Sequence, residues 1–262
     1  MNSFLINKSY LYLKHRLKSK SSLYLHSPFV FQFYNEVIKG KPLESDIKIN
    51  NYKKTLLQDN KSIEIQDFGA GSKVLSNSNR KIKDIARHNS KDIKQGSFMS
   101  RLVRFLKPNT ILEYGTSLGI SSLYMASALN SNAQLISMEG DPQLSKIAQN
   151  GCDQFNLKNI QLLNGEFDTC FPEVLQKTNS LDLVYFDGNH LKEPTLKYFQ
   201  DCINLANEDS AFVFDDIRWT ADMLSAWNII KAHPKVSLSI DLFDMGIIFF
   251  RQQAKENFCF NL

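Results

Sequence analysis

The chain has 262 residues, of which 43% are hydrophobic and 11% aromatic, so it can bury a sizeable core and is not wholly disordered. Its net charge of +4 hides a division. Residues 1–107 carry 21 basic and 8 acidic side chains, whereas residues 108–262 carry 10 and 19. This asymmetry indicates that the two parts have different surroundings or different tasks.

Several features bear on where the protein works. The sequence has no run of about 18 apolar residues, so we expect no membrane span. Its first residues lack the basic lead and apolar stretch of a secretory signal. The four cysteines (Cys152, Cys170, Cys202 and Cys259) include no Cys-x-x-Cys pair, which disfavours a zinc cluster or a disulfide framework. Together these features predict a protein of the reducing cytoplasm.

Residues 1–95 predict a basic and mainly helical N-terminal extension. Helical patterns occupy 11–20 and 27–38, residues 40–62 are polar and ambiguous, and 63–72 predict a short strand and turn. The glycine-bearing segment 67–71 lies in this turn, and we interpret it as a lid or a substrate-side loop. Nothing in the extension specifies a chemical group.

Residues 96–262 predict a second region, in which strands and helices alternate. Apolar strands are expected at 110–114, 134–138, 159–163, 181–186 and 210–214, with helical patterns between them. Such alternation predicts a parallel sheet covered by helices on both faces. The last two strands, 236–243 and 247–251, are joined by a turn too short for a parallel crossover, so they must be antiparallel. We therefore predict a Rossmann-like α/β fold: an open, mostly parallel, seven-stranded sheet with a C-terminal antiparallel hairpin.

A glycine loop follows the first of these strands. Glu113 ends the strand, and Gly115, Ser117 and Gly119 follow before a helix begins. Glycine lets a backbone turn sharply and approach a ligand, and a helix N-terminus offers amide groups to a carboxylate. Glu113 can accept a hydrogen bond from an ammonium group. Because the glycines are four residues apart, the dinucleotide pattern is not met, and the loop suits an amino acid end better than a pyrophosphate.

The next two strands also end in groups that suit a nucleoside. Glu139 and Gly140 follow the second strand, where an acid can take both hydroxyls of a ribose. Gly165 and Glu166 follow the third strand, where an adenine ring would lie. Each acid alone could be only a helix cap, but three successive strand ends with suitable groups favour a ligand.

Four motifs in combination resemble a known family: Glu-Tyr-Gly-Thr-Ser-x-Gly at 113–119, Met-Glu-Gly at 138–140, Phe-Asp-Gly-Asn-His at 186–190 and Phe-Asp-Asp at 214–216. Over residues 96–251 the sequence resembles class I S-adenosylmethionine-dependent methyltransferases. It is most similar to the O-methyltransferase-like branch, which includes catechol and macrolide-sugar enzymes. The resemblance implies S-adenosylmethionine as cofactor, held by Glu113, Gly115, Ser117, Gly119, Glu139, Gly140, Gly165, Glu166 and Asp187.

Three aspartates are expected at neighbouring strand ends: Asp187 after the fourth strand, and Asp215 with Asp216 after the fifth. Like charges held close require a proton or a cation, and a hard divalent ion such as Mg²⁺ or Ca²⁺ prefers oxygen ligands. In the metal-dependent O-methyltransferases that the sequence resembles, acids at these positions hold such an ion, which lowers the pKa of a substrate hydroxyl. The alternative is that the aspartates only cap a helix and order a loop.

His190 is the candidate general base, with Asp187 beside it, because the ordinary pKa of histidine suits proton removal near neutrality. A purely structural hydrogen bond is the alternative. Arg218 stands where macrolide-sugar relatives carry a histidine. Arginine stays protonated and cannot be a base, but it can bind a substrate carboxylate or phosphate.

The leading hypothesis is a cytoplasmic S-adenosylmethionine-dependent O-methyltransferase with a small-molecule acceptor and no membrane span; a homodimer is left open. One alternative is an RNA methyltransferase that uses the basic residues 1–107 as an electrostatic platform. It is less favoured, because no aromatic-and-basic RNA-binding motif is present. The other alternative is a non-catalytic member that binds a cofactor or a partner, which Arg218 favours.

Overall fold

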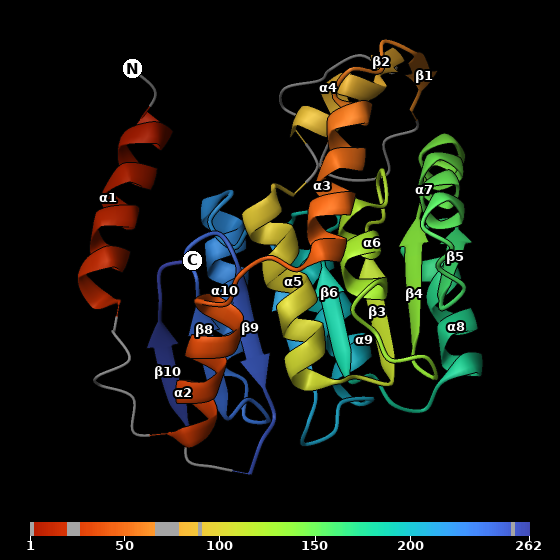
Figure 1. Ribbon diagram of the computed structural model, residues 1–262. Helices are drawn as coiled ribbons and strands as arrows, with labels where there is room; N and C mark the ends of the chain where they lie inside the picture. The colour runs from red at the N-terminus through yellow and green to blue at the C-terminus, as the bar shows by residue number, and fades with distance from the viewer. Residues whose placement is uncertain (1–2, 20–26, 66–78, 89–90, 253–254) are drawn as a thin grey trace.

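An eight-stranded sheet forms the centre of the protein (Figure 1). The computed structural model describes residues 3–19, 27–65, 79–88, 91–252 and 255–262. The strand order is β10-β8-β9-β7-β6-β3-β4-β5. The strands are β3 (Thr110–Tyr114), β4 (Gln134–Glu139), β5 (Ile160–Asn164), β6 (Leu183–Phe186), β7 (Ala211–Phe214), β8 (Leu238–Asp241), β9 (Gly246–Phe249) and β10 (Glu256–Cys259).

The strand directions confirm the predicted open and mostly parallel sheet with C-terminal antiparallel strands. The strands β3 to β7 are parallel to one another, and β9 is antiparallel to both β7 and β8. The chain runs outward from β3 to β5 and then returns to β6 on the other side of β3. The switch point is therefore between β3 and β6, where open α/β sheets bind their ligands.

The structure adds an eighth strand to the seven that the sequence predicts. β10 pairs in parallel with β8, and its Phe258 joins the same hydrophobic cluster as Phe260 and Leu238. Four residues beginning with Glu256 and Asn257 form no apolar run, so the local pattern does not mark a strand. The strand forms instead because Phe258 and Phe260 are buried against the edge of the sheet.

Helices cover both faces of the sheet (Figure 1). Within β3, Ile111 packs into one cluster with Phe98 of α5, while Leu112 packs into another with Phe199 of α9. Side chains of a strand alternate between faces, so one short strand contributes to two cores. These helices are α5 (Ile93–Leu106), α6 (Ile120–Ala126), α7 (Pro142–Gln154), α8 (Phe167–Lys177), α9 (Lys192–Ile203) and α10 (Ala221–Ala232).

The N-terminal part is mainly helical, as the sequence predicts. Its elements are α1 (Ser3–Lys18), α2 (Pro28–Phe33), the π-helical η2 (Tyr34–Ile38), α3 (Glu44–Leu56), β1 (Ser62–Glu64), β2 (Asn79–Lys81) and α4 (Ile82–His88). The helix α3 occupies the stretch 40–62 that is ambiguous in the sequence. The glycine-bearing segment 67–71 lies outside the described residues.

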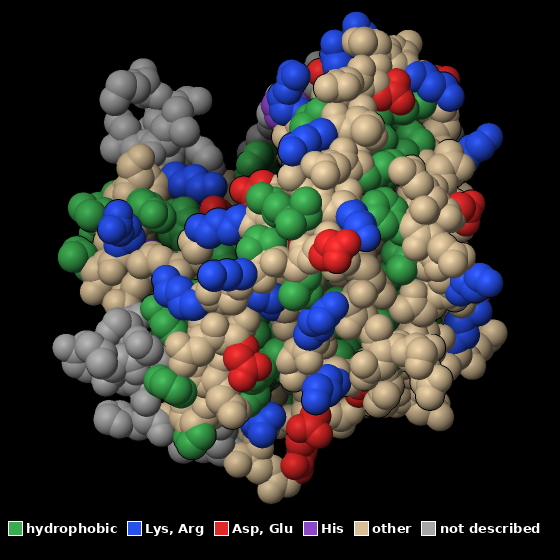
Figure 2. Space-filling model, in the orientation of Figure 1, with side chains coloured by type: hydrophobic (Ala, Val, Ile, Leu, Met, Phe, Trp, Pro, Cys, Tyr) green, Lys and Arg blue, Asp and Glu red, His purple; other side chains and the backbone are tan. Residues whose placement is uncertain are grey.

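The N-terminal helices do not form a separate core. Phe33 packs in the same cluster as Phe98 and Phe249, and Ile49 packs with Tyr124 of α6. A boundary between residues 95 and 96 stays a prediction, because elements on both sides of it share these clusters. Figure 2 shows lysine and arginine side chains spread over the face that α2, α3 and α5 present, in keeping with the charge division of the sequence. Among the described residues, no helix has the length and apolar character needed to cross a membrane.

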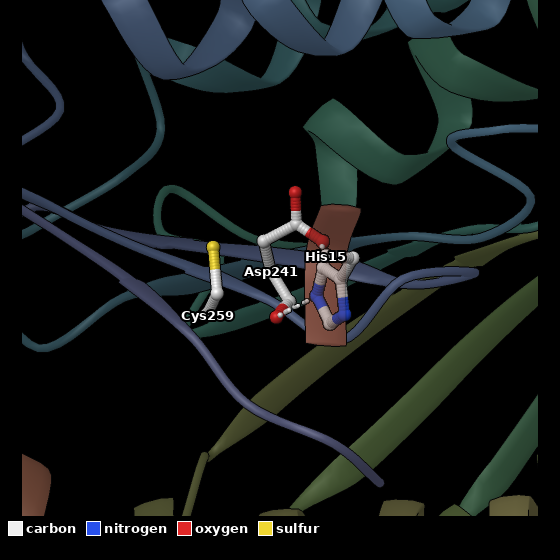
Figure 3. A group of neighbouring side chains, drawn as sticks. All are labelled: His15, Asp241 and Cys259. Carbon is white, nitrogen blue, oxygen red and sulfur yellow. Dashed lines mark hydrogen bonds and ion pairs between the residues drawn. The ribbon is translucent and has the colours of Figure 1, made fainter. Parts of the chain in front are cut away.

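The helix α1 is attached at the far edge of the sheet (Figure 1). His15 Nε2 lies 3.1 Å from both the carbonyl oxygen and the Oδ1 of Asp241. Lys8 Nζ lies 3.1 Å from Asp244 Oδ1, and the ring of Tyr12 packs edge-on against Phe243. Figure 3 shows His15 directed toward Asp241, with Cys259 beside them. The basic N-terminal helix therefore docks on residues 241–244, at the carboxyl end of β8.

Candidate active site at the carboxyl ends of the strands

The loop after β3 is shaped by close approach of neighbouring backbone. Gly115 has φ +97°, and a Cβ there would lie 2.6 Å from the carbonyl oxygen of Asp187. Gly119 has φ +79°, and a Cβ there would lie 2.9 Å from the Cβ of Ala148 on α7. Only glycine adopts such angles without strain and leaves room for these contacts. The spacing of the two glycines therefore reflects packing of the loop against β6 and α7.

Ser117 and Glu139 form the rim of this loop. The backbone N–H of Ser117 donates to Glu139 Oε2 at 2.7 Å, and that of Asp141 donates to Oε1 at 3.0 Å. Burial raises the pKa of Glu139. Ser117 has φ 49°, and its buried Oγ has no hydrogen-bond partner among the described residues. Buried hydroxyls are nearly always paired, so this one fits a donor or acceptor for a nucleoside-type ligand.

Glu113 points into the protein. Its side chain is fully buried, and its oxygens accept hydrogen bonds from the hydroxyls of Ser121, Ser122 and Ser137. Burial raises its pKa, and the three serine hydroxyls oppose that rise. The structure thus uses Glu113 to join β3, α6 and β4 beneath the loop. A direct contact with a ligand's ammonium group stays a prediction.

The loop after β5 lies against the end of β4. The N–H of Gly165 donates to the carbonyl of Glu139 at 2.9 Å, and Asn164 Nδ2 donates to the carbonyls of Glu139 and Gly140 at 2.8 and 3.3 Å. Glu166 is exposed at the start of α8. The residues predicted for ribose and adenine are therefore brought to one corner of the sheet, beside the glycine loop.

The ends of β6 and β7 carry a buried charge cluster with a member that sequence reasoning missed. Lys91 Nζ lies 3.2 Å from Asp187 Oδ2 and donates a hydrogen bond to Asp215 Oδ2. The side chains of Lys91, Asp187 and Asp215 are only 12%, 14% and 3% exposed. Tyr185 donates its hydroxyl to Asp187 Oδ2 at 3.1 Å. No local signal identifies Lys91, because its partner Asp215 is 124 positions away.

The protonation of this cluster follows from burial and from the lysine. Burial and the nearby Asp215 raise the pKa of Asp187 well above its ordinary value. Burial would also raise the pKa of Asp215, but Lys91 holds it below its ordinary value. Burial, followed by the neighbouring Asp215, raises the pKa of Asp216 to about 7. Although burial opposes the charged form of Lys91, Asp187, Asp215 and Asp216 together raise its pKa, so the ammonium keeps its charge.

His190 lies next to this cluster, with Nε2 3.7 Å from Asp187 Oδ1. Burial lowers the pKa of His190, so the imidazole is neutral near pH 7 and can accept a proton. Its backbone is left-handed, with φ 37°. Such angles cost about 1–3 kcal/mol in non-glycine residues and concentrate at functional sites. Five of the seven described non-glycine residues with positive φ lie at this edge of the sheet: Ser117, Asn189, His190, Asp216 and Phe243.

The described residues do not fit the predicted divalent ion at Asp187, Asp215 and Asp216. An ion held by Asp187 and Asp215 would need the place where the Lys91 ammonium contacts both carboxylates. A second group, His15, Asp241 and Cys259, has ligand atoms within 4.8 Å of one another (Figure 3). There both oxygens of Asp241 are already taken by a guanidinium group.

That guanidinium belongs to Arg218, whose role the sequence left open between binding an anionic substrate group and standing in place of a base. Its Nη1 and Nη2 donate to Asp241 Oδ1 and Oδ2 at 2.8 and 2.7 Å, and Nη1 also donates to the carbonyl of Phe243 at 2.6 Å. The side chain is 11% exposed, and this bidentate pair with Asp241 occupies both terminal nitrogens of the guanidinium. Arg218 therefore braces residues 241–243.

Comparisons with known proteins match the part of the chain that carries this site. A family model described as a methyltransferase domain matches residues 112–217. A catechol O-methyltransferase of Niastella koreensis is 30% identical over 125 residues, which cover 47% of this chain and 56% of that protein. One from Mus musculus is 30% identical over 114 residues, covering 42% and 41%. The chain thus spans about half the length of the curated relatives it matches.

Solved structures show the same fold over most of the chain. An O-methyltransferase of Streptomyces achromogenes, in complex with S-adenosylmethionine, has a TM-score of 0.58 and 16% identity, covering 84% of this chain and 94% of that one. An O-methyltransferase of Bacillus cereus, in complex with SAH, has a TM-score of 0.56 and 18% identity, covering 84% and 96%. The central sheet and the helices that cover it therefore have the same fold as these two solved structures.

Proposed function

We propose that the protein transfers a methyl group from S-adenosylmethionine to an oxygen of a small molecule, on the premise that residues 112–217 are a methyltransferase domain. The observation that carries the proposal is the rim after β3, where Ser117 and Glu139 meet and where Gly115 lies against the backbone of Asp187, three residues before His190. The named relatives, catechol O-methyltransferases, support an oxygen as the methylated atom.

Each part of the site has a role in this reaction. Glu139 and the loop of Gly165 would hold the nucleoside, and the hydroxyl of Ser117 would donate to it or accept from it. The cofactor supplies an electrophilic methyl group on a positively charged sulfur. His190, neutral near pH 7, would take the proton of the acceptor hydroxyl as the oxygen attacks. Placing the two reactants in line contributes most of the rate enhancement in such a direct transfer.

Titration calorimetry with S-adenosylmethionine tests cofactor binding. We expect binding at sub-millimolar concentration and a loss of roughly 10- to 100-fold in affinity for Glu139→Ala, since a hydrogen bond to a charged group contributes about 1.5–3 kcal/mol. Glu173→Ala is the matched control, because Glu173 is exposed on α8 and pairs only with Lys177 among the described residues. Wild-type affinity in Glu139→Ala would contradict the assignment.

His190→Gln tests the base. With a panel of hydroxylated acceptors, we expect kcat to fall by about 10²- to 10⁴-fold while the affinity for S-adenosylmethionine stays unchanged. An equal loss of cofactor affinity would instead mean that His190 shapes the pocket.

The cellular setting is also a proposal. All four cysteines are free, and Cys152, Cys170 and Cys202 are buried, which supports a reducing cytoplasm. A small molecule is the favoured acceptor. Nucleic acid binding by the basic face and a homodimer stay open. The non-catalytic alternative, which Arg218 favours because it stands where relatives carry a histidine, would be contradicted by methyl transfer to any hydroxylated acceptor.

A further inference from the structure

We infer that the ammonium of Lys91 is a cation built into the chain, which occupies the place between Asp187 and Asp215 where paired acids alone would recruit a divalent metal ion. The protein therefore binds no such ion at these acids and acts without one. The second statement rests on the proposed methyl transfer, whereas the first does not.

The geometry of the cluster carries this inference. Lys91 Nζ contacts one oxygen of each aspartate, 3.2 Å from Asp187 Oδ2 and hydrogen-bonded to Asp215 Oδ2. Two carboxylates on adjacent parallel strands converge on one point, and the ammonium lies at that point. A hard divalent ion bridging the two carboxylates would need their oxygens at about 2.0–2.6 Å. It would then share this point with a second positive charge, so the ion and the ammonium exclude each other.

The main chain of Lys91 is fixed as well as its side chain. Its carbonyl accepts a hydrogen bond at 2.9 Å from Lys53 Nζ on α3. The next residue, Asp92, caps α5 by accepting from the N–H of Gln95 at 2.8 Å. The ammonium is thus presented by a capped helix start and braced by the N-terminal helix α3. This assigns a task to the N-terminal part of the chain: it supplies the positive charge of the site.

An ammonium can also serve the acceptor. Lysine offers three donors, and two of them have partners in Asp187 and Asp215. The third can donate to the oxygen of an acceptor hydroxyl and stabilise the negative charge that develops there. The nearby His190 is placed to take the proton. A tethered cation would thus perform the electrostatic part of a metal ion's work at one fixed distance.

Binding of Mn²⁺, followed by electron paramagnetic resonance, tests the inference without any activity assay. At ~1 mM Mn²⁺ we expect no bound equivalent in the wild type, and about one equivalent in Lys91→Ala. The double variant Lys91→Ala/Asp215→Asn should lose the gained equivalent. Lys94→Ala is the matched control, since Lys94 is exposed on the first turn of α5 and donates to the carbonyl of Leu262.

Stability supplies a second readout. Without the ammonium of Lys91, the buried carboxylates of the cluster have no positive partner, so Lys91→Ala should have a lower melting temperature than the wild type. Saturating Mn²⁺ should raise the melting temperature of this variant by roughly 5 °C. The wild type and Lys94→Ala should not respond. Lys91→Met, which keeps the apolar stem, replaces Lys91→Ala if the latter does not fold.

Two results would overturn the inference. One is a wild-type equivalent of Mn²⁺ that Asp215→Asn removes. The other is a folded Lys91→Ala or Lys91→Met that binds no more Mn²⁺ than the wild type. Methyl transfer, once an acceptor is found, should be unchanged by chelator or by added Mg²⁺; dependence on Mg²⁺ would refute the second statement. If S-adenosylmethionine does not bind at all, the proposed function is wrong. The Mn²⁺ measurements still test the first statement, because they do not depend on methyl transfer.

Discussion

Replacing Arg218 by alanine should destabilise the protein without weakening cofactor binding. The guanidinium forms a bidentate pair with Asp241, and both side chains are largely buried, at 11% and 9% exposure. Removing one partner of a buried pair leaves a charge without compensation and typically costs 3–5 kcal/mol. His15 and the N–H of Phe243 still donate to the carboxylate in the variant, so we expect about 3 kcal/mol.

Urea denaturation at pH 7 measures this loss, and pH provides its signature. Burial alone would raise the pKa of Asp241, but His15 and Arg218 hold that pKa well below its ordinary value. A lowered pKa stabilises the fold above the unfolded value of about 3.9, and this contribution is lost as pH falls through the folded pKa. The difference between wild type and Arg218→Ala should therefore shrink below about pH 4.

Two controls define the result that would refute this reasoning. Replacing both partners, as in Arg218→Met/Asp241→Leu, should cost less than Arg218→Ala, because no charge is left buried. Affinity for S-adenosylmethionine should stay at the wild-type value in Arg218→Ala. A variant that keeps its stability within about 0.5 kcal/mol but loses affinity for an anionic acceptor would show that Arg218 binds substrate after all.

The loop and its support allow two further predictions. Gly115→Ala should destabilise the protein by at least about 1–3 kcal/mol and weaken cofactor binding, because the added Cβ meets the carbonyl of Asp187 at 2.6 Å and φ is +97°. Denaturation measures the loss of stability and calorimetry the loss of cofactor affinity. A variant with unchanged stability and affinity would refute the packing role of this glycine. Ser137→Ala removes one of three hydroxyls from buried Glu113 and should cost about 1–3 kcal/mol. Ser127→Ala is its control, because the partly buried hydroxyl of Ser127 donates to the carbonyl of Tyr124, three positions earlier. Equal losses in the two variants would contradict the assignment.

The sequence alone is sufficient to predict the sheet and the edge at which the site forms. Strand and helix periodicities are local, and the end of each parallel strand brings its following residues to the same edge. For this reason Glu139, Gly165, Asp187 and Asp215 could be placed near one another without a structure, and they do lie at one edge. Local backbone rules likewise account for the need for glycine at 115 and 119.

Tertiary structure decided which charges meet. Lys91 reaches Asp215 across 124 positions, and His15 reaches Asp241 across 226. No periodicity links such residues, since their approach depends on how α1, α3 and α5 pack over the sheet. The same holds for Glu113, whose three serine partners turn it inward, and for Arg218, whose partner is on β8. Electrostatic pairing depends on distances of a few ångströms, which folding sets and which the order of residues along the chain does not.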